Sequence, residues 1–418
     1  MKRVSSLRNK QRVFSKKTNW FLAKDKQINA HIYNPLPVVL SRGKGVELWD
    51  VDGKRYLDCI AGFGTMNHGH LHPKVYSAVL EQFGKLTMVG RCVLNDQMPQ
   101  LQLFLKELFG FDKSLLMNSG AEAGESAVKM AKKWGCLVKG IPMNEARVVF
   151  PKKNFWGRTI TAAASTDDPI RSEGFGPYGV GLDLVDFNNL EALEDYFKTN
   201  PNCAGYMFEP VQGEAGVVIP DDGYYKGVRE LCTKYNVLMM SDEVQCGLGR
   251  TGYLKALDCE DVRPDVLIIA KALSAGFYPV SAVLADSHIM DVWHPGCHGS
   301  TFSGNPVASV ASKAALEALV EENMVENAYE KGAWLLNEMQ RMKPHWCQEI
   351  RGKGMWFAIA PKPESGIKAE DFMLKAMDEG MLCYKAGGNT VRMSPPLIFT
   401  QENCEEMMEK LTSVMQKV

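Results

Sequence analysis

Residues 237–242 read Val237-Leu238-Met239-Met240-Ser241-Asp242, an unbroken apolar run that ends in an acid. A second run of this kind, Val266-Leu267-Ile268-Ile269-Ala270, is followed by Lys271. Short continuous apolar runs are typical of strands buried on both faces of a parallel sheet. In open sheets of this type, ligands bind at the carboxyl ends of the strands. The two runs therefore predict an α/β fold in which Asp242 and Lys271 lie at one rim of one site.

The same pattern extends outward from this stretch. Two more apolar runs end in polar residues, Leu115-Leu116-Met117 before Asn118 and Tyr206-Met207-Phe208 before Glu209. From about residue 75 to 310, such runs alternate with helical segments, which indicates a sheet covered by helices on both faces. We expect these polar strand ends to meet at the same rim.

The flanking regions have a different pattern. Residues 46–57 alternate apolar and polar side chains on both sides of Asp52-Gly53, which predicts a hairpin in an antiparallel meander. After about residue 315 we expect a long helix, a strand over 355–360, a helix over 369–378, short strands near 381–384 and 391–393, and a closing helix from Gln401. The chain then divides into a large domain over 75–314 and a smaller, discontinuous α+β domain made of 1–74 and 315–418.

Composition narrows the class of function. The 418 residues are 45% hydrophobic and 23% charged, which is ordinary globular composition and excludes a disordered or collagen-like chain. Lys and Arg number 48 against 49 Asp and Glu, a net charge of −1. Such a balance supplies no overall field for nucleic acid or an anionic membrane. We therefore expect small-molecule partners, with no nucleic acid and no membrane.

The cysteines and the N-terminus bear on the compartment. Eleven cysteines without CxxC spacing indicate reduced thiols in an intracellular protein. Eight basic residues precede the first acid, Asp25, which is compatible with a mitochondrial address. Because this segment is richer in Lys than in Arg and has little amphipathic pattern, we expect a cytoplasmic protein with a short basic extension.

Asp242 and Lys271 suggest a specific chemistry. Burial disfavours the charged ammonium and yields a neutral amine, which is a nucleophile toward aldehydes. A lysine that can form a Schiff base, paired with a carboxylate that can face a pyridinium nitrogen, is what pyridoxal 5'-phosphate requires. The turn Asn118-Ser119-Gly120-Ala121-Glu122-Ala123 supplies small residues at a helix start, which suits the phosphate. Alternatively, Lys271 is an ordinary surface lysine and the turn binds no ligand. The occurrence of the lysine, the carboxylate and the turn together at strand ends argues against this alternative.

At this point the sequence resembles the class III pyridoxal-phosphate aminotransferases of fold type I and, within this class, the ornithine aminotransferases. The resemblance runs from about Tyr33 to the C-terminal helix. It rests on seven motifs: Tyr33-Asn34-Pro35-Leu36-Pro37-Val38, Asn118-Ser119-Gly120-Ala121-Glu122-Ala123, Asn154-Phe155-Trp156-Gly157-Arg158-Thr159, Glu209-Pro210-Val211-Gln212-Gly213-Glu214-Ala215-Gly216, Asp242-Glu243-Val244-Gln245, Lys271-Ala272-Leu273-Ser274 and His298-Gly299-Ser300-Thr301-Phe302-Ser303-Gly304-Asn305-Pro306.

The resemblance implies a role for each cofactor-binding residue. Lys271 carries the cofactor and moves the proton, and Asp242 pairs with the pyridinium. Phe155 stacks on the ring, Gln245 reaches its phenolic oxygen, and Gly120 with Ala121 binds the phosphate. Thr301 reaches the phosphate of the neighbouring subunit, which implies a homodimer with shared sites.

The resemblance also implies a substrate. Arg158 with Tyr33 holds the α-amino-acid end of ornithine, and Arg392 holds the α-carboxylate of glutamate or 2-oxoglutarate. Glu214 covers Arg392 during the ornithine half-reaction. Phe63 and Trp156 complete the substrate-binding set. The expected activity is δ-transamination of ornithine with 2-oxoglutarate by a ping-pong mechanism.

Phe63 departs from the family pattern, because ornithine aminotransferases carry a tyrosine at this position. The missing hydroxyl leaves open another ω-aminotransferase that uses 4-aminobutyrate or N-acetylornithine. A catalytically silent cofactor-binding protein on the same fold is a third reading, against which the intact Lys271 and Asp242 argue. His68, His70 and His72 lack the spacing and partners of a zinc site, so we expect no metal.

Overall fold

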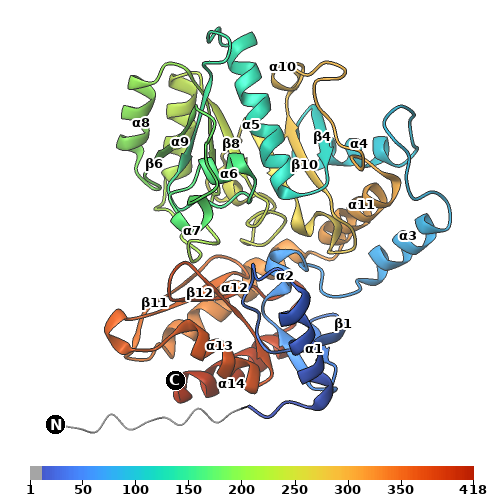
Figure 1. The fold of residues 1–418 in the computed structure, drawn as a ribbon, viewed down its shortest axis with the longest axis vertical. Coiled ribbons are helices and arrows are strands. Elements are labelled where there is room, and N and C mark those ends of the chain that lie inside the picture. The colour runs from blue at the N-terminus through green and yellow to red at the C-terminus, as the bar shows by residue number, and fades with distance from the viewer. Residues whose placement is uncertain (1–11) are drawn as a thin grey trace.

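The computed structural model describes residues 12–418. Four of the eight basic N-terminal residues discussed above, Lys2, Arg3, Arg8 and Lys10, lie outside this range. Figure 1 shows the described chain as two stacked parts, with a helix-covered sheet above and the elements of the N- and C-terminal regions below. Among residues 12–418, no helix is long and apolar enough to cross a membrane.

The upper part is built on a seven-stranded sheet with the order β4-β10-β9-β8-β7-β5-β6. Its strands are β4 (Lys113–Met117), β5 (Arg147–Pro151), β6 (Leu182–Val185), β7 (Cys203–Phe208), β8 (Leu238–Asp242), β9 (Val266–Ile269) and β10 (Ser281–Ala285). Only β10 runs against its neighbours, β4 and β9. The other strands are parallel, so their carboxyl ends meet at one edge. The predicted α/β fold with a mostly parallel sheet is confirmed.

The apolar runs of the large sheet are buried because helices cover both faces of the sheet. Every residue of β7, β8, β9 and β10 is buried. Helix α5 (Gly120–Leu137) packs on β7 and β9, and α9 (Tyr224–Lys234) packs on β8. Strands covered on both faces have no polar side to keep in water, so they contain continuous apolar sequence and place polar residues only at their ends.

Two smaller sheets form the lower part. The first has the order β1-β2-β3-β13, and the second has the order β11-β12-β15-β14. Their strands are β1 (Leu40–Lys44), β2 (Glu47–Asp50), β3 (Arg55–Asp58), β11 (Cys347–Gly352), β12 (Phe357–Pro361), β13 (Met381–Leu382), β14 (Tyr384–Ala386) and β15 (Thr390–Met393). The predicted hairpin is confirmed as β2 and β3. β13 pairs with β3, so a C-terminal strand joins the N-terminal sheet.

Helices cover the sheets and link the two parts. Besides α5 and α9 they are α1 (Lys16–Ile28), α2 (Ala61–Gly64), α3 (Pro73–Phe83), α4 (Met98–Phe109), α6 (Ile160–Ala164), α7 (Pro169–Ser172), α8 (Leu190–Thr199), α10 (Ser287–Met290), α11 (Pro306–Glu321), α12 (Met324–Arg341), α13 (Ala369–Asp378) and α14 (Gln401–Lys417), with 3-10 turns η1 (Ala256–Glu260), η2 (Lys271–Ser274) and η3 (Pro363–Ser365).

The sequence pattern missed three features of this fold. It did not predict β11, and the expected long helix after 315 is two helices, α11 and α12, separated at Asn323, whose φ is +52°. It also did not predict α1, which has no continuous apolar face. α1 is held by polar contacts instead, since Ser15 Oγ and Thr18 Oγ1 each donate to the Asp52 carboxylate at 2.7 Å.

Candidate active site

Asp242 and Lys271 lie at the same edge of the large sheet. β8 and β9 are adjacent, and Asp242 is in register with Ile268, three residues before Lys271. Lys271 begins the turn η2 with φ +45°, a left-handed conformation that side chains other than glycine rarely adopt. Such strain, of about 1–3 kcal/mol, concentrates at functional sites, where the surrounding fold enforces it. The predicted meeting of the carboxylate and the amine at one rim is confirmed.

Burial adjusts the charge of both groups. It lowers the pKa of Lys271 to about 8, although Glu214, Glu209 and Asp242 oppose that change. Lys271 therefore loses its proton more readily than an ordinary lysine. Burial also raises the pKa of Asp242 to about 6, against the Val244 N–H, which donates to Oδ1 at 3.1 Å. Asp242 remains mostly ionised at neutral pH, as a partner for a cationic ring requires.

The phosphate-binding turn lies at the start of α5. Ser119 Oγ accepts from the Glu122 N–H, and Glu122 Oε2 accepts from the N–H groups of Asn118 and Ser119. This capping box satisfies the donors around the turn. The N–H groups of Gly120 and Ala121, in the first helical turn, have no intrahelical acceptor and are available to an anion.

The space around this turn fits pyridoxal phosphate. A cavity of about 270 Å³ is lined by Asn118, Ser119, Gly120 and Lys271. A Cβ added to Gly120 would lie 2.9 Å from Val244 Cγ1, so a side chain at this position would collide with the segment that follows Asp242. The cavity thus joins the amine of Lys271 to the phosphate-binding turn, and Val244 brings the segment after Asp242 next to Gly120.

Glu209, whose role the sequence did not reveal, joins two loops of the site. It follows β7, and its Oε1 accepts from the Phe155 N–H at 2.8 Å while Oε2 accepts from the Gly213 N–H at 3.4 Å. Burial, with a further contribution from Asp242, raises its pKa to about 8. Glu209 is therefore a mostly neutral acid that ties the Phe155 turn to the turn that carries Glu214. Its position at a buried strand end was the signal that could have identified it.

Trp156 requires a correction. The family pattern placed it in substrate binding, but its side chain lies in the core. The indole stacks on Phe150 with ring centroids 5.6 Å apart, and its Nε1 donates to Ser165 Oγ at 2.9 Å. Trp156 therefore packs in the core, whereas the neighbouring Phe155 lies beside the guanidinium groups of Arg158 and Arg171.

Arg392 and Glu214 form the predicted pair. Arg392 Nη1 donates to Glu214 Oε1 at 2.7 Å, and the Arg392 side chain is only 2% exposed. Burial alone would raise the pKa of Glu214, but the charges of Arg392, Lys271 and Arg171 outweigh it and lower the pKa. The Arg392 guanidinium also lies 5.8 Å from the centroid of the Phe63 ring.

Phe63 is held in an unusual backbone conformation. It belongs to α2, where residues 61–64 all have positive φ, with +60° at Phe63 itself. Gln245 Nε2 donates to the Phe63 carbonyl at 3.1 Å, and the ring meets Tyr384 edge to face at 5.3 Å. Gln245, expected at the phenolic oxygen of the cofactor, thus also supports the loop that presents Phe63.

The remaining residues lie at the periphery. Tyr33 is 64% exposed and lines a groove of about 850 Å³ together with Phe63 and Tyr384. Arg158 is exposed, and its guanidinium lies 5.6 Å from the centroid of the Phe155 ring. Thr301 is exposed on the loop before α11. All three side chains are exposed in the single chain.

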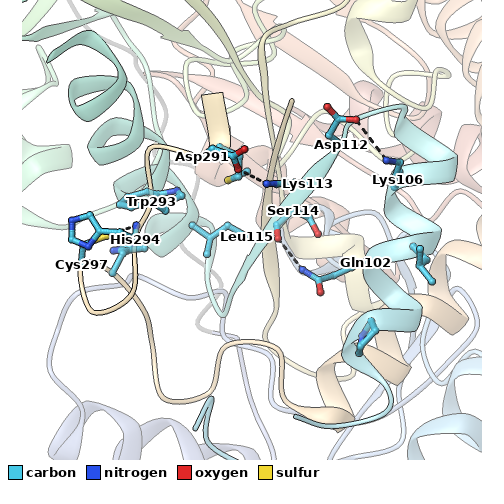
Figure 2. A pocket seen from close by; sticks show the side chains of 14 residues that line it. Gln102, Lys106, Asp112, Lys113, Ser114, Leu115, Asp291, Trp293, His294 and Cys297 are labelled. Atoms are coloured by element: carbon cyan, nitrogen blue, oxygen red, sulfur yellow. Dashed lines mark hydrogen bonds and ion pairs between the residues drawn. The ribbon is translucent and has the colours of Figure 1, made fainter. Parts of the chain in front are cut away.

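A separate pocket of about 640 Å³ lies between α4, β4 and the loop after α10 (Figure 2). Its charged side chains are paired with one another. Lys113 binds Asp291, and Lys106 lies 3.6 Å from Asp112. It contains none of the residues that the sequence assigned to the site, and we do not assign it to catalysis.

Comparisons with known proteins agree with this geometry. The family model described as Aminotransferase class-III matches residues 28–415. The chain is 46% identical over 387 residues to the mitochondrial ornithine aminotransferase of Drosophila melanogaster, covering 93% of this chain and 89% of the relative. It superimposes on the ornithine aminotransferase of Toxoplasma gondii with a TM-score of 0.94 and 40% identity over 96% of both chains. It superimposes on an acetylornithine aminotransferase of Elizabethkingia anophelis with a TM-score of 0.87 and 38% identity, covering 96% of this chain and 99% of that one. The chain belongs to the class-III aminotransferase family.

Proposed function

We propose that this protein is an ornithine δ-aminotransferase that converts L-ornithine and 2-oxoglutarate into L-glutamate 5-semialdehyde and L-glutamate in two half-reactions. The observation that carries the proposal is the pair of arginines around Lys271. Arg392 is buried and covered by Glu214 at 2.7 Å, whereas Arg158 stands open at the rim. An enzyme that must take the δ-amine of one substrate and the α-amine of the other needs two carboxylate sites, of which one can be masked.

The enzyme is a pyridoxal-phosphate-dependent aminotransferase, and we propose specific roles for its residues. Pyridoxal phosphate, when bound, supplies an electron sink for the substrate carbon that loses a proton. Lys271 Nζ would hold the cofactor and would move the proton of the substrate carbon. Asp242 would pair with the ring nitrogen, and Phe155 would pack on the ring. The N–H groups of Gly120 and Ala121 would bind the phosphate, and Gln245 would bind the phenolic oxygen.

The two half-reactions place different demands on the arginines. With Glu214 on Arg392, the α-carboxylate of ornithine can only be held further out, by Arg158 and Tyr33, so the δ-amine points inward. For glutamate, Glu214 must leave, and Arg392 then binds the α-carboxylate close to Lys271. Planar guanidinium groups suit bidentate carboxylate binding in both positions.

A donor panel tests this assignment. L-ornithine, 4-aminobutyrate and N-acetylornithine are compared as amine donors to 2-oxoglutarate by their kcat/KM values. We expect ornithine to exceed both others. Preference for N-acetylornithine or 4-aminobutyrate would assign the chain to a different ω-aminotransferase, and an enzyme that binds the cofactor but turns over no donor would be a silent binding protein.

We also propose that the functional unit is a homodimer. α3 and the segment after it expose Leu80, Phe83, Leu86, Val93 and Leu94, and an exposed Phe302 follows Thr301. Exposed apolar side chains in such number mark an interaction surface. Thr301 then contributes to the partner's site. Light scattering on the purified enzyme tests the assembly, and mixing inactive Lys271→Ala with Thr301→Ala subunits tests for shared sites.

The domain division and the compartment are further proposals. The β3–β13 pairing supports one discontinuous small domain made of 1–74 and 315–418 around a large domain at 75–314.

For the compartment we propose the cytoplasm, because the basic segment from Ser15 onward is part of the folded protein through its contacts with Asp52. The Drosophila relative named above is mitochondrial, so imaging a fluorescent fusion with and without residues 1–14 separates the two compartments.

A further inference from the structure

Arg171 borders the site, and the assignments above give it no role. It lies on α7, which Figure 1 shows at the end of the upper part that faces the lower part. Its side chain is 19% exposed, which is low for an arginine on a four-residue helix. Nothing in the sequence pattern distinguished it from a solvated surface cation.

Two contacts hold the Arg171 guanidinium in place. Nε lies 3.0 Å from Asp168 Oδ2, and Nη1 donates to the Asn154 carbonyl at 3.1 Å. Asp168 is itself held, because its Oδ1 accepts from the Ile170 N–H at 3.0 Å. Neither contact of the guanidinium involves Nη2, which leaves that nitrogen available to an acceptor.

Arg171 and Arg158 approach the same aromatic ring. The guanidinium carbons of Arg171 and Arg158 lie 4.8 and 5.6 Å from the centroid of Phe155. Arg158 is exposed, so on its own it would bind a carboxylate with little net gain after screening and ordering. Arg171 is already ordered by its contacts, which lowers the cost of binding.

Arg171 lies close enough to the site for its charge to act on Glu214, and its guanidinium carbon is 4.8 Å from the centroid of the Phe155 ring. Its charge is one of those that lower the pKa of Glu214, after Arg392 and Lys271. Glu209 supplies the structural link, since it bonds the backbone of both Phe155 and Gly213, the residue before Glu214. Arg171 and Glu214 therefore lie on loops that are connected through Glu209.

We propose that Arg171 is a specificity-determining residue that binds the carboxylate of the amino donor together with Arg158. The proposal rests on the proposed function and deepens it. Two guanidinium groups at the outer end of the pocket hold ornithine with its δ-amine toward Lys271. They supply recognition where Phe63 lacks a hydroxyl group.

Three donors that share a four-carbon segment next to the reacting amine test the role. Ornithine and 5-aminopentanoate both carry a carboxylate four carbons from the reacting amine, whereas 1,4-diaminobutane has no carboxylate. Arg171→Ala should lower kcat/KM for the first two by about tenfold to a hundredfold, the effect of a lost charge-assisted hydrogen bond, and leave the diamine within about twofold. Where a donor reacts too slowly, its inhibition constant against ornithine replaces kcat/KM. Arg171→Lys should restore part of the loss.

The controls separate this role from others. Arg341→Ala, which removes an exposed arginine of α12 paired with Glu338, should change none of the three values. Equal losses for all three donors would show that Arg171 only supports Phe155 and would overturn the proposal, as would no loss at all. The proposal would also fail if the loss vanished in a Glu214→Ala background, because Arg171 would then act through Glu214. Wild-type turnover of ornithine in the same panel tests the proposed function separately. If that turnover were absent, the carboxylate dependence would still be measured with 5-aminopentanoate against the diamine.

Discussion

Arg392 and Glu214 form a 2.7 Å ion pair in which, among the described residues, Arg392 Nη2 is buried without a partner. A buried guanidinium that is only half satisfied is costly to keep, and a carboxylate with two oxygens would satisfy it better. The pair therefore favours replacement of Glu214 by a substrate carboxylate over a permanent ion pair.

Arg392→Ala should damage the 2-oxoglutarate half-reaction by about a hundredfold or more and the ornithine half-reaction far less, because only the first uses Arg392. Removing one member of a buried charge pair typically costs about 3–5 kcal/mol. Glu214→Ala should expose Arg392 and permit α-transamination of ornithine. Stopped-flow measurement of each half-reaction distinguishes the two effects. Equal losses in both half-reactions, together with a shared fall in stability, would indicate a static ion pair.

Lys271→Ala should abolish turnover while cofactor binding persists with reduced affinity, because the Gly120 turn and Asp242 remain. Equilibrium dialysis measures the remaining affinity. Borohydride reduction of the wild-type enzyme followed by peptide mapping should label Lys271, and a label on any other lysine would refute the assignment.

Asp242→Ala should leave the cofactor attached to Lys271 but slow the chemical step by several orders of magnitude, since a ring nitrogen without its carboxylate is a poor electron sink. Removing one partner of a buried charge pair typically costs about 3–5 kcal/mol. Single-turnover rates measure the step directly. Rates close to wild type would mean that Asp242 does not face the ring.

Phe63→Tyr should raise the preference for ornithine over 4-aminobutyrate by about 0.5–1.5 kcal/mol, the net value of one hydrogen bond. The ring lies 5.3 Å from the Tyr384 ring and 5.8 Å from the Arg392 guanidinium, so polar groups are near it. The ratio of kcat/KM values for the two donors is the measurement. An unchanged ratio would show that residue 63 only packs the wall.

Glu209→Gln should alter how stability depends on pH. Its pKa is raised to about 8, so between an unfolded-state pKa near 4.5 and about 8 the folded protein holds a proton that the unfolded chain releases. Stability from this group is then present below about pH 4.5 and is lost as the pH rises toward 8. Relative to wild type, the glutamine variant should gain in Tm as the pH increases across this window. Parallel Tm curves for the two proteins would contradict a protonated Glu209.

The sequence by itself determined the class of fold and the chemical centre. β7, β8 and β9 are apolar throughout because both faces of the sheet are covered, and a polar residue at the end of such a strand can only lie at the sheet edge. Asp242 and Lys271 were therefore predictable as a pair. The Arg392–Glu214 pair was predictable through the family motifs, since 178 positions separate the two residues and no local pattern connects them.

Only the tertiary structure decided which neighbours surround these groups. Trp156 is next to Phe155 in sequence, yet packing on Phe150 turns it into the core. Glu209 acquires its raised pKa from burial and from Asp242, and neither influence is visible in its own segment. Arg171 borders the site because Asp168, Asn154 and Phe155 converge on it. Strand periodicity is a local consequence of solvent exposure and can be predicted from the sequence, whereas the contacts of loop side chains depend on how distant segments pack.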